Sequence, residues 1–400
     1  MRFQPATAVD VDISAAPIEL SVVMPCLNEA DTLATCIRKA RRAMDAAGIV
    51  GEVIVADNGS TDPSRHIALA EGARLVPVEG RGYGAALMGG IEAARGRFVI
   101  MGDADDSYDF GEIGKFVERL RHGYDLVQGC RLESGGGSIL PGAMPLLHRW
   151  LGNPMFSRIA RSWFQAPVHD VYCGLRGFNK TFYAQLDQRC TGMEFATEMI
   201  IKASLTRARI AEVPITLHPD GRRSHPPHLK TFRDGWRTLR FFLACTPRRL
   251  FLWPGLILLV LGLAGYTVAM PGMTIGRLTF DAHTLLFASL LVICGHQSMM
   301  FSVIAKTFAI TEGLLPADAR VARFSRLLPL ERGLAMGLVA VLAGLVMLGA
   351  TANEWRVRDF GRLNYADTMR VVVPGVTLAV LGFQTMLSCL LLSLLEMRRR

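Results

Sequence analysis

Arg97-Phe-Val-Ile-Met-Gly-Asp103-Ala-Asp105-Asp106 joins a short apolar run to a cluster of carboxylates, and it decides the fold of the first half of the chain. Four consecutive apolar residues between polar neighbours predict a buried β-strand. Carboxylates packed together repel one another, so such a cluster persists only where a divalent cation or a network of turn hydrogen bonds relieves the repulsion. The stretch therefore predicts a strand that ends at a metal site or, alternatively, at a polar turn.

Four further runs of this kind surround the strand. They are rich in β-branched residues and comprise residues 20–24, 52–56, 74–78 and 125–128. Helix-compatible stretches separate them, and one helix should run from about Glu29 to Ala47, because apolar residues recur on one face and Gly48 follows. Alternating strands and helices predict an α/β fold with a Rossmann-like, mostly parallel sheet.

In such a sheet, ligands bind beyond the carboxyl ends of the strands. Three of these ends carry polar, acidic turns, which are Pro25-Cys-Leu27-Asn28-Glu29, Asp57-Asn58-Gly59-Ser-Thr-Asp62 and Asp103-Ala104-Asp105. A dinucleotide-binding fold would place Gly-x-Gly-x-x-Gly after the first strand, and the turn there has no glycine. The sequence therefore disfavours a dinucleotide site.

The stretch Gly80-Arg-Gly82-Tyr-Gly84 opens a predicted helix after the third strand. Exposed backbone amides and the helix dipole can receive a phosphate or the rim of a nucleotide at such a position. Alternatively, the small residues provide a flexible turn and close helix packing.

The average composition conceals distinct parts of the chain. Half of its 400 residues are hydrophobic and the mean hydropathy is +0.29, yet 20% are charged. Residues 1–228 hold the strands and turns, residues 229–249 form an amphipathic basic segment, and residues 250–400 contain apolar runs at about 250–270, 284–304, 334–350 and 371–395. We expect a soluble domain, an interfacial helix and an all-α domain with about four transmembrane helices.

Charge and cysteine usage indicate a location. The first twenty residues lack a basic start followed by an apolar block, so we expect no secretory signal and a cytoplasmic catalytic domain. The eight cysteines form no Cys-x-x-Cys pair and should stay reduced. Much of the basic excess behind the net charge of +9 lies beside the spans, which favours a multi-pass protein of the inner (plasma) membrane over a partner nucleic acid. The loop holding Arg356, Arg358, Arg362 and Arg370 fits this topology less well.

The three acidic turns, in this order, resemble those of the family 2 glycosyltransferases, whose GT-A-like fold binds a nucleoside-diphosphate sugar. The resemblance covers roughly the first 245 residues. It implies that Asp105, helped by Asp103, coordinates Mg²⁺ or Mn²⁺ on the diphosphate, and that Asp57 contacts the base or ribose of the donor. A cation there would stabilise the charge that builds up on the leaving group. The nucleotide-sugar residues that it implies are Pro25, Leu27, Asn28, Glu29, Asp57, Asn58, Gly59, Gly82, Gly84, Asp103, Ala104 and Asp105.

Downstream motifs look like the polyprenyl-phosphate branch of this family, similar to dolichyl-phosphate mannose and glucose synthases. They include Gly129-Cys-Arg131 and Asp170-Val-Tyr-Cys-Gly174-Leu-Arg176-Gly-Phe178. Arginine's planar fork suits phosphate oxygens, and Arg131 matches a family position for the acceptor phosphate. Arg222, Arg223 and Ser224 lie where a basic loop would close over the site, although both arginines are alternatively surface charges.

Asp170 completes the expected catalytic set with Asp105 and Arg131. We expect its main role to be orienting the acceptor and not acting as a base, because a phosphate monoester is already largely ionised near neutrality. Alternatively, it caps a helix or pairs with Arg176. Related enzymes often carry Asp-Ala-Asp-Leu-Gln, whereas Asp106 and Ser107 stand here, which points to a different metal shell or donor.

The resemblance implies an inverting, membrane-anchored glycosyltransferase that moves a hexose from a nucleotide sugar to a polyprenyl phosphate in one displacement. A processive polysaccharide synthase is the alternative enzyme, but no Gln-x-x-Arg-Trp run follows the acidic motifs. A non-catalytic scaffold or lipid carrier that retains the fold is the alternative from another class, and it would bind donor without turnover. An oligomer is compatible with the sequence.

Overall fold

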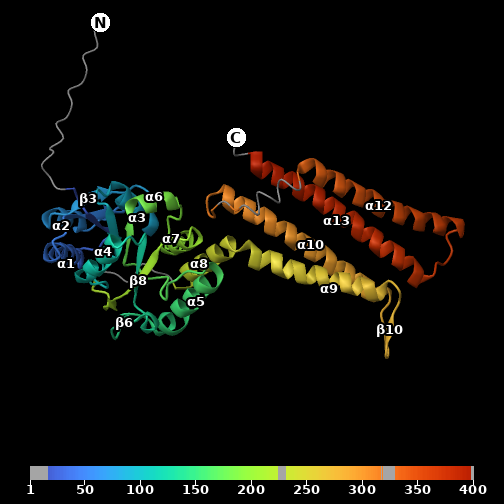
Figure 1. Cartoon of the computed structure of the whole chain (residues 1–400), viewed down its shortest axis with the longest axis horizontal. Coiled ribbons are helices and arrows are strands. Elements are labelled where there is room, and N and C mark those ends of the chain that lie inside the picture. The colour runs from blue at the N-terminus through green and yellow to red at the C-terminus, as the bar shows by residue number, and fades with distance from the viewer. Residues whose placement is uncertain (1–16, 224–230, 317, 319–328, 398–400) are drawn as a thin grey trace, which may run out of the picture. The chain divides into compact units, whose positions relative to one another are not determined.

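The computed structural model describes residues 17–223, 231–316, 318 and 329–397 (Figure 1). Its contacts divide the chain into two compact units, Met1–Leu239 and Arg240–Arg400. Ser224, which the sequence assigned to the acceptor phosphate, lies outside the described residues.

The first unit is built on a seven-stranded sheet within the described residues. Its strands are β1 (Leu20–Cys26), β2 (Gly51–Asp57), β3 (Arg74–Pro77), β4 (Phe98–Met101), β5 (Leu126–Cys130), β7 (Arg176–Asn179) and β8 (Ile210–Pro214). They lie in the order β3-β2-β1-β4-β7-β5-β8. Neighbouring strands pair in parallel, except that β7 is antiparallel to β4 and to β5. The predicted α/β fold with a mostly parallel sheet is confirmed.

Helices cover both faces of this sheet (Figure 1). They are α1 (Leu33–Ala46), α2 (Ser64–Ala70), α3 (Tyr83–Ala93), α4 (Ile113–Arg121), α5 (Asn153–Phe164), α6 (Lys180–Leu186) and α7 (Phe195–Leu205). Alternate residues of a strand point to opposite faces, so Val22 packs in one core with α1, α2 and α4, whereas Val23 faces Gly90 of α3. On that second face, α7 contacts α3 and α6.

Short elements complete the first unit. They are the 3₁₀ turns Phe110–Glu112 and Glu133–Gly135, the π-helical turn His148–Gly152, and the parallel pair of β6 (Ser138–Ile139) and β9 (Thr216–Leu217). Because β1, β2, β4 and β5 run in the same direction, their carboxyl ends lie at one edge of the sheet. This arrangement brings the acidic turns to that edge, as expected for an α/β sheet.

The second unit holds four long apolar helices among the described residues. They are α9 (Trp253–Ala269), which the π-helical turn Arg248–Leu252 precedes, α10 (Ala282–Thr311), α12 (Leu330–Val357) and α13 (Tyr365–Met397), with a hairpin of β10 (Thr274–Ile275) and β11 (Leu278–Thr279). Each is long and apolar enough to cross a bilayer, which confirms the expected four spans. Glycines allow close packing, since a Cβ on Gly344 would lie 2.4 Å from the carbonyl oxygen of Gly375.

The expected interfacial segment coincides with α8 (Thr231–Cys245). Arg233, Arg237 and Trp236 are exposed on it, as the bilayer-surface hypothesis requires. Phe242, which recurs at helical spacing with Trp236 and Leu239 in the apolar stripe of α8, is fully buried. This part of the apolar stripe therefore packs within the protein, and the placement of α8 at a bilayer surface stays a prediction.

Candidate active site

An ionic cluster joins the turns after β1 and β4 to a loop near the end of the first unit. Glu29 follows β1, Asp105 follows β4, and Arg222 comes from the loop after β9. The Nε of Arg222 donates to Oε2 of Glu29 at 2.7 Å, and its Nη2 donates to Oδ2 of Asp105 at 3.0 Å. A third bond, from Nη1 to Asp220, completes the shell of this mostly buried guanidinium. Arg222 therefore lies in the acidic site, and not apart from it as a surface charge.

Asp103 is the member of the acidic cluster that is incompletely satisfied. Its Oδ1 is buried and has no hydrogen-bond partner in the structure. Burial and the neighbouring charge of Asp105 raise the pKa of Asp103 to about 7, although a hydrogen bond from Tyr83 and the charge of Arg222 oppose the rise. An unpaired carboxylate oxygen beside a second carboxylate fits a divalent cation, which takes oxygen ligands and would relieve the repulsion.

The two residues that depart from the family pattern have structural roles. Ser107 donates to Oδ1 of Asp105 from both its hydroxyl, at 2.6 Å, and its backbone N–H, at 3.0 Å. Asp106 has a left-handed backbone with φ of 59° and bonds Nζ of Lys39 at 2.8 Å. Ser107 thus fixes the carboxylate of Asp105, while Asp106 turns away to α1. Within the described residues, no three His, Cys, Asp or Glu side chains form a ready-made metal cluster.

Asp57 and Asn58 organise the turn after β2. Asp57 is buried, accepts from the backbone N–H groups of Gly59 and Ser60, and pairs with Arg65 at 2.6 Å. Asn58 accepts from the N–H of Gly82 at 2.9 Å and donates to the carbonyl of Gly80 at 2.6 Å. The second acidic turn is therefore tied to the glycine-rich stretch, and contact of these residues with a nucleotide stays a prediction.

The glycines of that stretch have a packing cause. Gly82 adopts φ of 127°, and a Cβ there would lie 2.4 Å from the carbonyl oxygen of Thr191. A Cβ on Gly84 would meet the carbonyl oxygen of Cys190 at the same distance. The N–H of Ala85, in the first turn of α3, already donates to Thr191. Close packing, the alternative left open by the sequence, therefore accounts for these glycines, whether or not a phosphate binds nearby.

In the turn after β1, Asn28 has φ of 61°, and its side-chain oxygen accepts from the N–H of Thr61 at 2.8 Å. It thereby fastens the first acidic turn to the second. Pro25 lies within β1, and Leu27 and Ala104 lie in the turns beside Asn28 and Asp103. Thr32 donates to the carbonyl of Ala104 at 2.6 Å, which fixes the acidic turn against the start of α1.

A second charged pair lies at the end of β5. Arg131 donates to Asp170 from Nε at 2.7 Å and from Nη2 at 2.9 Å, and its backbone N–H adds a bond of 3.1 Å. Both side chains are buried. Arg176, the alternative partner of Asp170, instead donates to the backbone carbonyls of Cys173 and Ala196, so the structure does not support the alternative Asp170–Arg176 pair.

Tyr108, which the sequence did not mark as a site residue, contacts Arg131 and the turn at Gly174. Its hydroxyl accepts from the N–H of Gly174 at 2.8 Å and lies 3.4 Å from Nη1 of Arg131. A Cβ on Gly174 would lie 2.9 Å from Oδ2 of Asp103 and 3.2 Å from the Tyr108 hydroxyl. Asp103 and Arg131 therefore flank the same small turn. In the sequence, the only indication that Tyr108 belongs to the site was its position three residues after Asp105.

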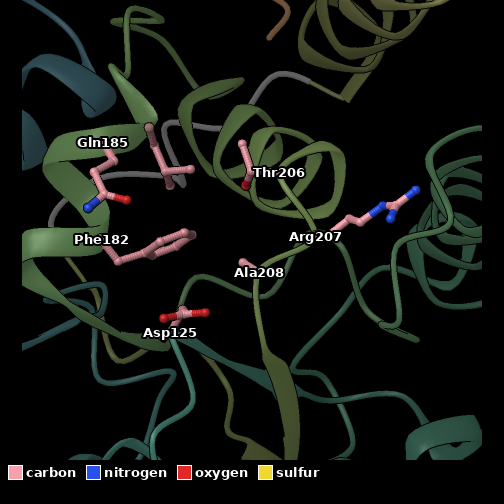
Figure 2. Close-up of a pocket in the computed structure, with 7 residues that line it drawn as sticks. Asp125, Phe182, Gln185, Thr206, Arg207 and Ala208 are labelled. Atoms are coloured by element: carbon pink, nitrogen blue, oxygen red, sulfur yellow. The ribbon is translucent and has the colours of Figure 1, made fainter.

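Other predicted residues lie further from this centre. Arg223 is exposed, and its backbone N–H donates to Asp31 at 3.0 Å. Glu198 is buried and pairs with Lys202 at 2.7 Å on the same helix, α7, so it has a structural partner. A pocket of about 220 Å³ lies beside Asp125 and Arg207 (Figure 2). These residues precede β5 and β8, so the pocket lies at the amino ends of these strands, away from the acidic edge. None of its described lining residues belongs to the predicted site.

Two domain families match the chain. Residues 21–186 match the glycosyl transferase family 2 domain, and residues 303–396 match the glycosyltransferase family 2 C-terminal transmembrane region. The low-salt glycan biosynthesis hexosyltransferase Agl6 of Haloferax volcanii is 38% identical over 385 residues, which cover 96% of this chain and 90% of that protein. The chain is a family 2 glycosyltransferase. The resemblance found in its acidic turns is confirmed.

Another relative of this glycosyltransferase is the dolichyl-phosphate hexose transferase of Haloferax volcanii. It is 32% identical over 218 residues, which cover 54% of this chain and 89% of that protein. Among solved structures, glucosyl-3-phosphoglycerate synthase from Mycobacterium tuberculosis, in complex with Mn²⁺, UDP and glucosyl-3-phosphoglycerate, has a TM-score of 0.43 and 22% identity. That match covers 56% of this chain and 77% of the other. The glycosyltransferase is thus a membrane protein with a catalytic α/β domain.

Proposed function

We propose that this enzyme transfers a hexose from a nucleoside-diphosphate sugar to a polyprenyl phosphate. The observation that carries the proposal is the turn at Gly174, which separates the acidic pair Asp103 and Asp105 from the Arg131–Asp170 pair. An acid cluster suited to a cation and an arginine suited to a phosphate oxygen thereby lie on either side of one short turn. The name of the dolichyl-phosphate hexose transferase relative supports a lipid phosphate as acceptor.

On the donor side, Asp103 and Asp105 would hold Mg²⁺ or Mn²⁺, with Ser107 fixing Asp105. The cation would neutralise charge on the departing diphosphate. For both carboxylates to serve as ligands, Arg222 has to release Oδ2 of Asp105, which it occupies in this structure. The released guanidinium then binds a donor or acceptor phosphate, and Arg223 and Ser224 follow it in the sequence.

On the acceptor side, Arg131 binds the lipid phosphate. Asp170 fixes the guanidinium plane through two bonds, so its role is to position Arg131 and not to remove a proton. An ionised phosphate oxygen attacks the anomeric carbon while the bond to the nucleoside diphosphate breaks on the opposite side. One displacement of this kind inverts the anomeric configuration, and the electron pair of the broken bond leaves with the nucleotide.

The membrane domain keeps the enzyme beside its acceptor, because a polyprenyl tail stays in the bilayer. We place the catalytic domain, residues 1–228, on the cytoplasmic face of the inner membrane, with residues 229–249 at the bilayer surface and residues 250–400 spanning it. The absence of a Gln-x-x-Arg-Trp run favours single transfer over a processive synthase.

The test uses membranes containing the full chain, labelled nucleotide sugars, polyprenyl phosphate and Mg²⁺ or Mn²⁺. We expect label in the organic extract, and we expect Asp105→Asn to reduce it by roughly a hundredfold or more. Asp106→Asn is the matched control, because Asp106 pairs with Lys39 and lies outside the predicted metal site. Its transfer activity should stay within a fewfold of the parent. Donor binding without any transferred label would favour the scaffold alternative. Equal activity of Asp105→Asn and the parent would contradict the metal site.

A further inference from the structure

A helical segment of the catalytic domain exposes large apolar side chains. It comprises the helical residues Leu146 and Leu147, the π-helical turn His148–Gly152 that follows them, and α5 (Figure 1). Leu146 is 73% exposed and Trp150 is 69% exposed, and Leu147, Leu151 and Met155 are also exposed. Exposed apolar side chains clustered in one segment mark interaction sites in proteins that otherwise bury such groups.

The core of the domain does not require these side chains. Phe156, Ala160 and Phe164 already provide the buried face of α5. Leu147, Leu151, Met155 and Arg158 recur at spacings of four, four and three residues, so they lie on another side of the same helical segment. The segment therefore has two apolar faces, of which one is buried in the domain and the other is exposed.

The charged residues within this segment have one sign. From Pro141 to Val168 the sequence contains Arg149, Arg158 and Arg161 and no Asp or Glu. Arg158 and Arg161 are exposed, and the guanidinium of Arg149 lies 5.5 Å from the ring centre of Trp150 while it pairs with Glu133. Tryptophan, leucine and arginine side chains together are typical of a surface that enters the headgroup layer of an anionic bilayer.

We propose that this exposed face, the 146–161 surface, docks the catalytic domain on anionic phospholipid headgroups. The surface consists of Leu146, Leu147, Trp150, Leu151 and Met155 with Arg149, Arg158 and Arg161. Because the chain carries helices that can span a membrane, its catalytic domain stays tethered to a bilayer, and lipid headgroups are therefore always close to this surface. Charge complementarity selects anionic lipid over a second copy of the chain, which would bring the same arginines together.

The 146–161 surface is joined to the Arg131–Asp170 pair. Ser157 on α5 accepts from the N–H of Val171, the residue after Asp170, at 3.1 Å. Arg149 bonds Glu133, two residues after Arg131, at 2.8 Å. Docking the surface on headgroups thus holds the predicted acceptor-phosphate residue near the layer that contains lipid phosphates. This consequence rests on the proposed function, but the docking itself does not.

The experiment attaches a nitrobenzoxadiazole fluorophore to Leu146→Cys in the full chain, reconstituted in nanodiscs that contain a headgroup-nitroxide lipid. Leu69→Cys is the matched control, because Leu69 is an apolar residue of α2 with 60% exposure in the same unit. The parent chain gives the background from native cysteines, of which Cys294 is exposed. No donor or acceptor is added, so this result is independent of catalysis.

With phosphatidylglycerol present, we expect quenching at Leu146→Cys to exceed that at Leu69→Cys by about threefold or more. Adding Arg158→Gln and Arg161→Gln should lower it to the value measured in phosphatidylcholine alone. Equal quenching at the two positions would overturn the proposal. So would fluorescence at Leu146→Cys that ignores the nitroxide lipid but rises when labelled chains are diluted with unlabelled ones, because a second copy would then cover the surface.

Discussion

Arg222 and Asp105, 117 positions apart in the sequence, form an ion pair in which Nη2 lies 3.0 Å from Oδ2. The same guanidinium also bonds Glu29, so one cation of the protein is shared between two carboxylates of the acidic edge. Any divalent ion that uses Asp105 competes with this guanidinium. Metal affinity and the position of the loop at Arg222 are therefore coupled.

Arg222→Gln should bind Mn²⁺ more tightly than the parent. The substitution removes a competing cation worth about 1 kcal/mol, which corresponds to roughly fivefold in affinity. Mn²⁺ titration followed by electron paramagnetic resonance measures the change. Arg223→Gln, which removes an exposed charge, is the control and should leave the affinity as it is. Unchanged Mn²⁺ affinity in Arg222→Gln would show that the ion and the guanidinium occupy different places.

Ser107→Ala should weaken Mn²⁺ binding by about tenfold, because the hydroxyl that orients the carboxylate of Asp105 is lost. The same titration measures it, together with the metal concentration that gives half-maximal transfer. Ser107→Thr retains a hydroxyl and should recover most of the affinity. If Ser107→Ala and Ser107→Thr bind the ion equally well, the bond to Asp105 has no part in the metal site.

Asp170→Asn should destabilise the catalytic domain by about 3 kcal/mol, because it leaves the guanidinium of Arg131 buried without a full counter-charge. Unfolding of the purified protein, followed by intrinsic fluorescence, gives the free energy. The double variant Arg131→Met with Asp170→Leu should regain much of that stability but not the transfer activity, since no phosphate ligand remains. A double variant that transfers hexose normally would remove Arg131 from the acceptor site.

Glu52 provides a test of pH dependence away from the active site. Burial alone would raise its pKa, but bonds from Ser21, the N–H of Arg95 and Arg74 outweigh burial and lower it. A lowered folded-state pKa contributes stability above the unfolded value of 4.5, and this contribution is lost as the pH falls through the folded value. Glu52→Gln should therefore lower the unfolding temperature clearly at neutral pH and much less in acid. An equal decrease at both values would contradict the assignment.

The sequence predicted the elements whose patterns are local. The strands β1 to β5 were visible because each contains a short run of apolar, mostly β-branched residues, and the four spans because of their length. β7 was not predicted as a strand. Its four residues, Arg-Gly-Phe-Asn, are half polar, and its buried Arg176 donates to the backbone carbonyls of Cys173 and Ala196, which the sequence pattern does not reveal.

The site residues were predictable as residue types at strand ends, whereas their partners were not. Asp170 pairs with Arg131, 39 positions away, and not with the nearer Arg176, because the sheet places the ends of β5 and β7 side by side. Arg222 was expected at the acceptor phosphate, and its bond to Asp105 in this structure, which the fold of the loop after β9 makes possible, could not be predicted. Distances along the chain carry no information about such pairs.

Because β7 is antiparallel to β4 and β5, the length of the segment just before it is constrained. Since β7 begins at the edge where its parallel neighbours end, the residues just before it, Asp170 to Leu175, pass between the two charged groups. Gly174 lies so close to Asp103 that a Cβ would come within 2.9 Å of Oδ2. Four residues earlier, Asp170 accepts a hydrogen bond from Arg131. In the proposed mechanism, the length of this turn sets the distance between the donor site and the acceptor site. One inserted residue would spoil the alignment of the two substrates without removing a single contact residue from either.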